Sequence, residues 1–111
     1  MSRPLKRVSK KKLRDLFNRG AYWQKARNGE LDVDIERSRE IAQPLCRKLR
    51  MPPGSVSQIV AYRVPGGGKV AVVHQYVRPD GGVRGKPDPK YLLVDGEILT
   101  PPPKPPKKKT A

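Results

Sequence analysis

The feature that most constrains the fold is a change in the spacing of apolar residues at Met51-Pro52-Pro53-Gly54. Before this point, between Leu31 and Leu49, apolar side chains recur at helical spacing. From Ser55 onward, apolar and polar residues alternate, as they do along a strand. Proline fixes φ and lacks a backbone donor, so this segment ends a helix. The sequence therefore predicts an α+β chain, with helices first and an antiparallel sheet second.

The first helix is predicted over residues 10–19. Leu13, Leu16 and Phe17 share one face, and the opposite face is basic. Ser9 is a suitable N-cap, because its hydroxyl can accept a hydrogen bond from a free backbone amide. Gly20 can end this helix, and a further turn or short helix is expected between Ala21 and Gly29.

A second helix is predicted over residues 32–50. Acids lie near its start and bases near its end, where the helix dipole favours each. Pro44 lies inside this span, so we expect a kink there. The balanced charges indicate a scaffold helix.

Four short strands are predicted after the proline segment, over residues 55–64, 69–77, 91–95 and 97–99. The glycine-rich loop 65–68 joins the first two strands, and Asp95-Gly96 favours a type I′ turn between the last two. The expected result is a three- or four-stranded antiparallel meander with the helices packed on one face.

The 111 residues suffice for one small domain. We expect a basic disordered arm at 1–9, a single α+β domain at 10–100 and a disordered Pro/Lys-rich tail at 101–111. Net charge is +15, and most of the excess lies in the two ends. A charge of this size favours polyanionic partners. A domain this small leaves little room for a large cofactor, so none is expected.

Cys46 is the only cysteine, which excludes a disulfide within the chain and a four-thiolate zinc site. His74 is the only histidine, and no metal-ligand spacing is present. No apolar stretch approaches the roughly 20 residues of a membrane-spanning helix, and no apolar run follows the basic N-terminus as in a signal peptide. We therefore expect an intracellular, cytoplasmic protein.

The segment 78–90 is predicted to be a long loop stiffened by prolines and by Asp80-Gly81. The lysines and arginines of this loop suggest phosphate contact, although an ordinary solvated surface loop would have the same composition. The leading hypothesis is a nucleic-acid-binding protein, with RNA slightly favoured over DNA. The predicted phosphate-contacting residues are Lys10, Lys11, Lys12, Arg14, Arg19, Arg63, Arg78, Arg84, Lys86, Lys90, Lys107, Lys108 and Lys109.

Two alternatives remain open. A small toxin-type ribonuclease could use His74, Tyr76 and Arg78, which follow one another at alternate positions of a strand and could supply proton transfer and a cation. Against this, the chain has no second histidine. A non-enzymatic module that binds an acidic protein partner would also explain the charge. The Pro65-Gly-Gly-Gly-Lys69 sequence does not meet the spacing of a nucleotide-binding P-loop.

Overall fold

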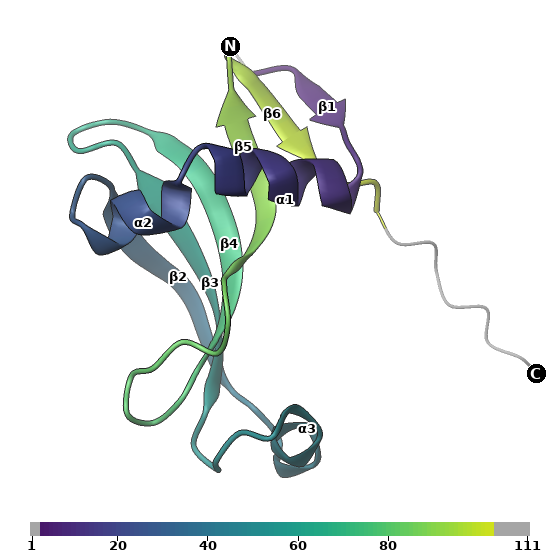
Figure 1. Ribbon diagram of the computed structural model, residues 1–111, viewed down its shortest axis with the longest axis vertical. Coiled ribbons are helices and arrows are strands. Elements are labelled where there is room, and N and C mark those ends of the chain that lie inside the picture. The colour runs from purple at the N-terminus through teal and green to yellow at the C-terminus, as the bar shows by residue number, and fades with distance from the viewer. Residues whose placement is uncertain (1–2, 104–111) are drawn as a thin grey trace, which may run out of the picture.

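The computed structural model describes residues 3–103, and its main element is one six-stranded sheet in the order β1-β6-β5-β4-β3-β2 (Figure 1). β1 pairs with β6 in parallel and every other neighbouring pair is antiparallel. The strands are β1 (Leu5–Arg7), β2 (Asp32–Glu40), β3 (Val56–Arg63), β4 (Lys69–Val77), β5 (Asp88–Val94) and β6 (Glu97–Thr100). The α+β class and the largely antiparallel sheet are confirmed, but the predicted number of strands was too low.

The helices are α1 (Lys10–Arg19), α2 (Tyr22–Arg27) and α3 (Gln43–Leu49). Ser9 caps α1 as expected, because its Oγ accepts from the amide of Lys12 at 3.0 Å. Gly20 ends α1 with a φ of −78°, so its left-handed freedom is not used there. A Cβ at this position would lie 2.5 Å from the ring of Tyr22, so glycine permits the close approach of α2.

The predicted helix over residues 32–50 is wrong in its first half. Asp32–Glu40 forms β2, which pairs with β3, and only Gln43–Leu49 is helical. Val33 and Ile35 fit a strand repeat as well as a helical one, and the free edge of β3 supplies the hydrogen bonds that decide the outcome. Pro44 lies in the first turn of α3 and kinks nothing, because amides there have no partner within the helix.

The predicted disordered arm differs from the structure at Leu5–Arg7. These residues pair with β6, and Val8 N donates to Thr100 O at 3.0 Å. A strand of three residues is too short to show an apolar repeat, and its partner lies more than 90 positions away along the chain, so the sequence pattern does not indicate it. Most of the predicted tail, residues 104–111, lies outside the described residues.

The hairpin of β3 and β4 is confirmed, with small shifts at the strand ends. Asp95 and Gly96 both have positive φ, 50° and 79°, in a two-residue turn between Val94 and Glu97, as a type I′ turn requires. β5 begins at Asp88, three positions earlier than predicted, so the loop before it spans residues 78–87.

Most of the core lies between α1 and one face of the sheet, here called the helix face. Leu13 and Phe17 of α1 pack there on six buried sheet residues: Val60, Tyr62, Ala71, Val73, Leu92 and Leu99. Burial also raises the pKa of Tyr62 to about 12. A second, smaller cluster joins Ile41, Cys46 and Met51 around α3. The thiol of Cys46 is free and buried, and no helix in residues 3–103 is long and apolar enough to cross a membrane.

We expect Leu13→Ala to lower the free energy of unfolding by about 2–5 kcal/mol, because the fully buried side chain leaves a cavity between helix and sheet. Leu45→Ala is the matched control, since Leu45 is 40% exposed, and should change it by only about 0.5 kcal/mol. Urea denaturation followed by circular dichroism measures both. Equal losses in the two variants would contradict this account of the core.

Candidate nucleic-acid interface

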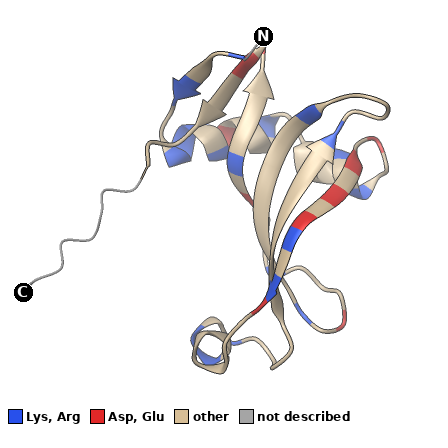
Figure 2. Cartoon of the chain, turned by 180° about the vertical axis from the view of Figure 1, so that it is seen from behind, with Lys and Arg blue, Asp and Glu red and all other residues tan. Residues whose placement is uncertain are grey.

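Charge is divided between the two edges of the sheet. β1 and the neighbouring α1 form a basic edge with one acid, Asp15, and seven bases: Lys6, Arg7, Lys10, Lys11, Lys12, Arg14 and Arg19. β2 forms an acidic edge with four acids and two bases. Figure 2 shows the acids in red along β2 and the bases in blue on β1 and α1. A polyanion therefore meets a favourable surface at the basic edge and an unfavourable one at the acidic edge.

The parallel pairing of β1 with β6 brings the two ends of the described chain together. The Arg7 guanidinium donates to the Pro101 carbonyl at 3.0 Å. Figure 1 shows β1 leading directly into α1, with the end of β6 close by. Lys10, Lys11 and Lys12 are exposed there and form no ion pair with any described residue. The predicted contacts Lys107, Lys108 and Lys109 lie outside the described residues. The described residues of the two predicted end segments, 1–9 and 101–111, therefore lie together at one corner of the sheet.

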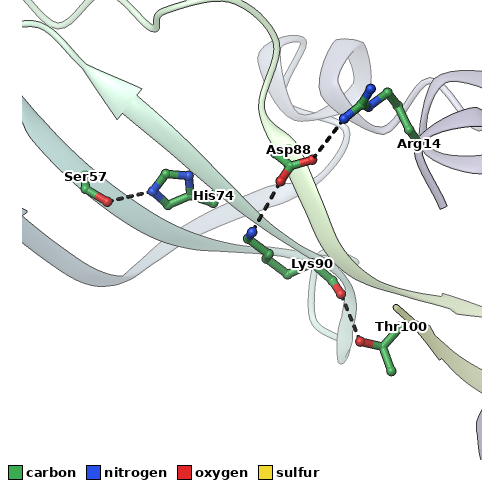
Figure 3. A network of polar contacts seen from close by, with 6 residues as sticks. All are labelled: Arg14, Ser57, His74, Asp88, Lys90 and Thr100. Atoms are coloured by element: carbon green, nitrogen blue, oxygen red, sulfur yellow. Dashed lines mark hydrogen bonds and ion pairs between the residues drawn. The ribbon is translucent and has the colours of Figure 1, made fainter. Parts of the chain in front are cut away.

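Asp88 links α1 to the sheet. Its carboxylate lies 3.8 Å from the Arg14 guanidinium and 3.2 Å from the Lys90 ammonium (Figure 3). The carbonyl of Lys90 accepts from the Thr100 hydroxyl at 3.2 Å. These groups are about half exposed, so the ion pairs add little stability. Their effect is to hold two predicted contact residues, Arg14 and Lys90, on either side of one acid.

A hollow of about 290 Å³ lies between α1 and the end of the 78–87 loop. Arg14 and Asn18 line it from the helix, and Lys86, Pro87 and Asp88 line it from the loop and β5. The side chains of Arg14, Asn18 and Lys86 all carry N–H donors, which suits an anionic oxygen ligand such as phosphate. The structure thus brings together Arg14 and Lys86, which are 72 positions apart in the sequence.

A second hollow, of about 340 Å³, lies between α2 and the same loop, lined by Trp23, Arg27 and Val83. The Arg27 guanidinium stacks on the indole of Trp23, 5.0 Å from the ring centroid. Arg27 was not among the residues predicted from the sequence to meet phosphate. The i, i+4 spacing of Trp23 and Arg27 on one helix was the available signal.

The sheet between these hollows and α3 carries a polar strip on the helix face. Gln75 Nε2 donates to Gln58 Oε1 at 3.0 Å, and Gln58 Nε2 donates to Ser38 Oγ at 3.4 Å. Gln58 and Gln75 share the helix face with the core residues Val60 and Val73, because each lies two positions along the same strand. On the helix face, two side-chain amides and a hydroxyl therefore follow the buried apolar residues along these strands.

The 78–87 loop is held by its own hydrogen bonds. The amide of Arg78 donates to the Gly82 carbonyl at 2.9 Å, and Val77 and Val83 pair across the base of the turn. Arg84 Nε donates to the Leu49 carbonyl at 3.1 Å and braces the loop on α3. Arg84 therefore has a structural contact, although it was predicted to meet phosphate. The loop is preorganised, as its prolines and glycines indicated.

Arg63, another predicted contact, is ion-paired with Asp34 of the acidic edge strand. Its position on β3, next to β2, separates it from α1 along the order of the strands. Arg63 is therefore the predicted residue that the structure places least well for a shared phosphate surface. Arg19, by contrast, is the last residue of α1 and is exposed, at the end of the helix opposite to Lys10, Lys11 and Lys12.

His74 lies on β4, directly across from Asp88 of β5, on the sheet face opposite the helix face. Its Nε2 lies 2.6 Å from the hydroxyl of Ser57 (Figure 3). The His74 ring also meets the ring of Tyr76 edge-on, with 4.7 Å between the ring centroids. Burial lowers the pKa of His74; Lys90 lowers it further and Asp88 opposes this. A neutral imidazole with Nε2 unprotonated can accept a hydrogen bond from the Ser57 hydroxyl, which is a structural use of the side chain.

The three residues of the ribonuclease hypothesis do not form a hydrogen-bonded group in the described structure. Tyr76 packs against the cluster around α3, and the Arg78 guanidinium lies beside Gly82 in its own turn. Within residues 3–103, no three His, Cys, Asp or Glu side chains are grouped so that they could hold a metal ion. The donor-rich hollows therefore offer more for ligand binding than the surroundings of His74.

The lowered pKa of His74 predicts a pH-dependent stability. The unfolded chain, with a histidine pKa near 6.5, binds a proton more readily than the folded protein, so stability falls as pH drops from 6.5 through the lowered value. His74→Gln should flatten this dependence between about pH 7.5 and about pH 5.5, the range in which histidine titrates. Urea denaturation across that range measures the effect. An unchanged slope in the variant would show that His74 is not its source.

No family model, curated protein or solved structure matches the chain.

Proposed function

We propose that the protein binds nucleic acid, preferring RNA to DNA, and that phosphates bind along the basic edge and in the hollow between Arg14 and Lys86. The observation that carries this proposal is the exposed row Lys10, Lys11 and Lys12 at the start of α1, unpaired within the described residues and beside the ends of the described chain. Cations held on a folded element lose little freedom when a polyanion binds.

The driving force is the release of counterions from the nucleic acid. Each phosphate neutralised by lysine or arginine frees condensed cations, so affinity falls steeply as salt rises. Lys11, Lys12, Arg14 and Arg19 lie outside the buried stripe of Leu13 and Phe17, and these four bases are exposed at the surface of α1. Such contacts set affinity and orientation, and they carry no sequence information by themselves.

The preference for RNA rests on the second hollow, between α2 and the 78–87 loop, and on the polar strip of the helix face. Trp23 and Arg27 present an aromatic ring and a guanidinium plane, on which unpaired bases can stack. Unstacked bases are common in irregular RNA and are absent from a regular DNA duplex. The amides of Gln58 and Gln75 lie on the same sheet face and offer donors and acceptors to base edges.

The test compares the wild type with Lys10→Gln/Lys11→Gln/Lys12→Gln, using a labelled single-stranded RNA of mixed sequence. We expect weaker binding and a plot of log affinity against log salt that is shallower by about 2, because each lost contact to single-stranded RNA removes about 0.7. Fluorescence anisotropy at several salt concentrations measures both quantities. Binding that does not depend on salt would overturn the proposal.

The matched control is Lys25→Gln/Lys48→Gln/Arg47→Gln, which removes the same charge from exposed positions on α2 and α3. It should keep most of the affinity, since these residues lie outside the basic edge. A loss as large as that of the first variant would indicate general attraction to the net charge.

The same RNA, run on a denaturing gel after incubation, tests the ribonuclease alternative. Cleavage by the wild type that disappears in His74→Gln would favour an enzyme over a binding protein. Tight, salt-resistant binding to an acidic protein with none to RNA would favour the third hypothesis, an acidic protein partner.

A further inference from the structure

β2 is a long free edge. All nine of its residues, Asp32–Glu40, are exposed, and only one of its sides pairs with another described strand, β3. A free edge presents backbone donors and acceptors that can pair with a further strand. Proteins usually protect such edges with charges and bulges, and β2 has both, because the register with β3 shifts between Ile35 and Arg37.

The order of the charges distinguishes β2 from a merely protected edge. The first half carries the acids Asp32, Asp34 and Glu36, and the second half carries Arg37 and Arg39 before the strand ends at Glu40. A protective row of one sign repels a second copy of the same strand. A row that changes sign at its middle attracts a second copy in the antiparallel direction, since each acidic half then meets a basic half.

The bulge places these charges on one face. Asp32 and Asp34 lie opposite Arg63 and Ala61 of β3, and Arg37 and Arg39 lie opposite Ile59 and Ser57. These four partners occupy alternate positions of one strand, so their side chains share a face, and the residues opposite them share it too. In a regular strand with no bulge at Glu36, the arginines would lie on the face opposite to the acids.

We propose that β2 pairs antiparallel with β2 of a second copy, about a two-fold axis between Ile35 and Glu36. In this register Asp32 lies opposite Arg39 of the second copy, and Asp34 lies opposite Arg37, so symmetry gives four pairs of unlike charge. Val33 lies opposite Ser38 on the helix face. The two six-stranded sheets join into one continuous sheet.

Two further observations suit this dimer. Val33 and Ile35 are 47% and 59% exposed, and a second strand alongside covers part of their surface. Glu36 lies next to the axis, where it approaches its own copy, and the ammonium of Lys69 is paired with it and offsets its charge.

The position of the edge also limits repulsion between two molecules of charge +15. β2 and β1 are the opposite ends of the strand order, so pairing through β2 leaves the basic edges far from the interface. Salt at about 150 mM screens charges more than about 8 Å apart, while the close unlike pairs at the interface are screened much less.

The test uses the full chain at about 150 mM salt. Sedimentation velocity up to about 0.5 mM protein, where mass action favours association, should show a concentration-dependent dimer for the wild type. In D32R/D34R every charged residue of β2 is basic except Glu36 and Glu40. In R37D/R39D every charged residue of β2 is acidic. Each double variant alone should dimerise at least about tenfold more weakly, because like charges then face each other.

An equal mixture of the two double variants should restore the dimer as a one-to-one heterodimer, since every facing pair is again unlike. D15R/E30R is the matched control for D32R/D34R, because it adds the same positive charge at exposed positions outside β2 and should dimerise like the wild type. Circular dichroism verifies that each variant is folded, which matters for D34R because Asp34 also pairs with Arg63.

A wild type that stays monomeric at the highest concentration overturns the proposal. So does a dimer that both double variants form as well as the wild type, since the contact then lies elsewhere. Failure of the RNA experiment leaves this result unaffected, because the two surfaces are on opposite edges of the sheet.

Discussion

The structure depends on the packing of one helical stripe, Leu13 and Phe17 of α1, into the helix face of the sheet. That contact supplies the largest group of buried side chains in the described chain, and it fixes the rotation of α1 about its own axis. Once the apolar stripe is buried, the lysines and arginines of the helix have only the solvent side to occupy. The placement of the basic edge is therefore a consequence of core packing. The same contact brings Arg14 to Asp88 and creates the hollow with Lys86.

The elements whose repeat and end signals agree were predictable from sequence. α1 has both an apolar stripe and the Ser9 cap, and the β5–β6 turn has Asp95-Gly96, for which two positive φ angles are inexpensive. β2 was not predictable, because its alternation fits two periods and the free edge of β3, a distant segment, decides between them. β1 is a still clearer case, since a strand of three residues exists only because β6 leaves an edge open.

The candidate site likewise has features that were predictable from the sequence and features that were not. Arg14 and Lys86 were each expected to meet phosphate on the basis of charge, but their proximity follows from where α1 crosses the sheet, which no local pattern records. Arg63 and Arg84 have the same local character, and the structure gives them an ion pair and a backbone contact instead. Charge thus selected the candidate residues, and tertiary contacts show which of them are also engaged within the described chain.

The pairing of β1 with β6 also affects the order in which the chain can fold. Leu5 lies opposite Ile98, so β1 has no partner until residues 98–100 have been synthesised. Contacts between such distant segments form late, because a long loop must close before they add stability. Leu13 and Phe17 likewise need Leu92 and Leu99 to complete their cluster. The basic residues of α1 therefore take their places on the sheet only after the segments that carry Leu92 and Leu99 are available for packing.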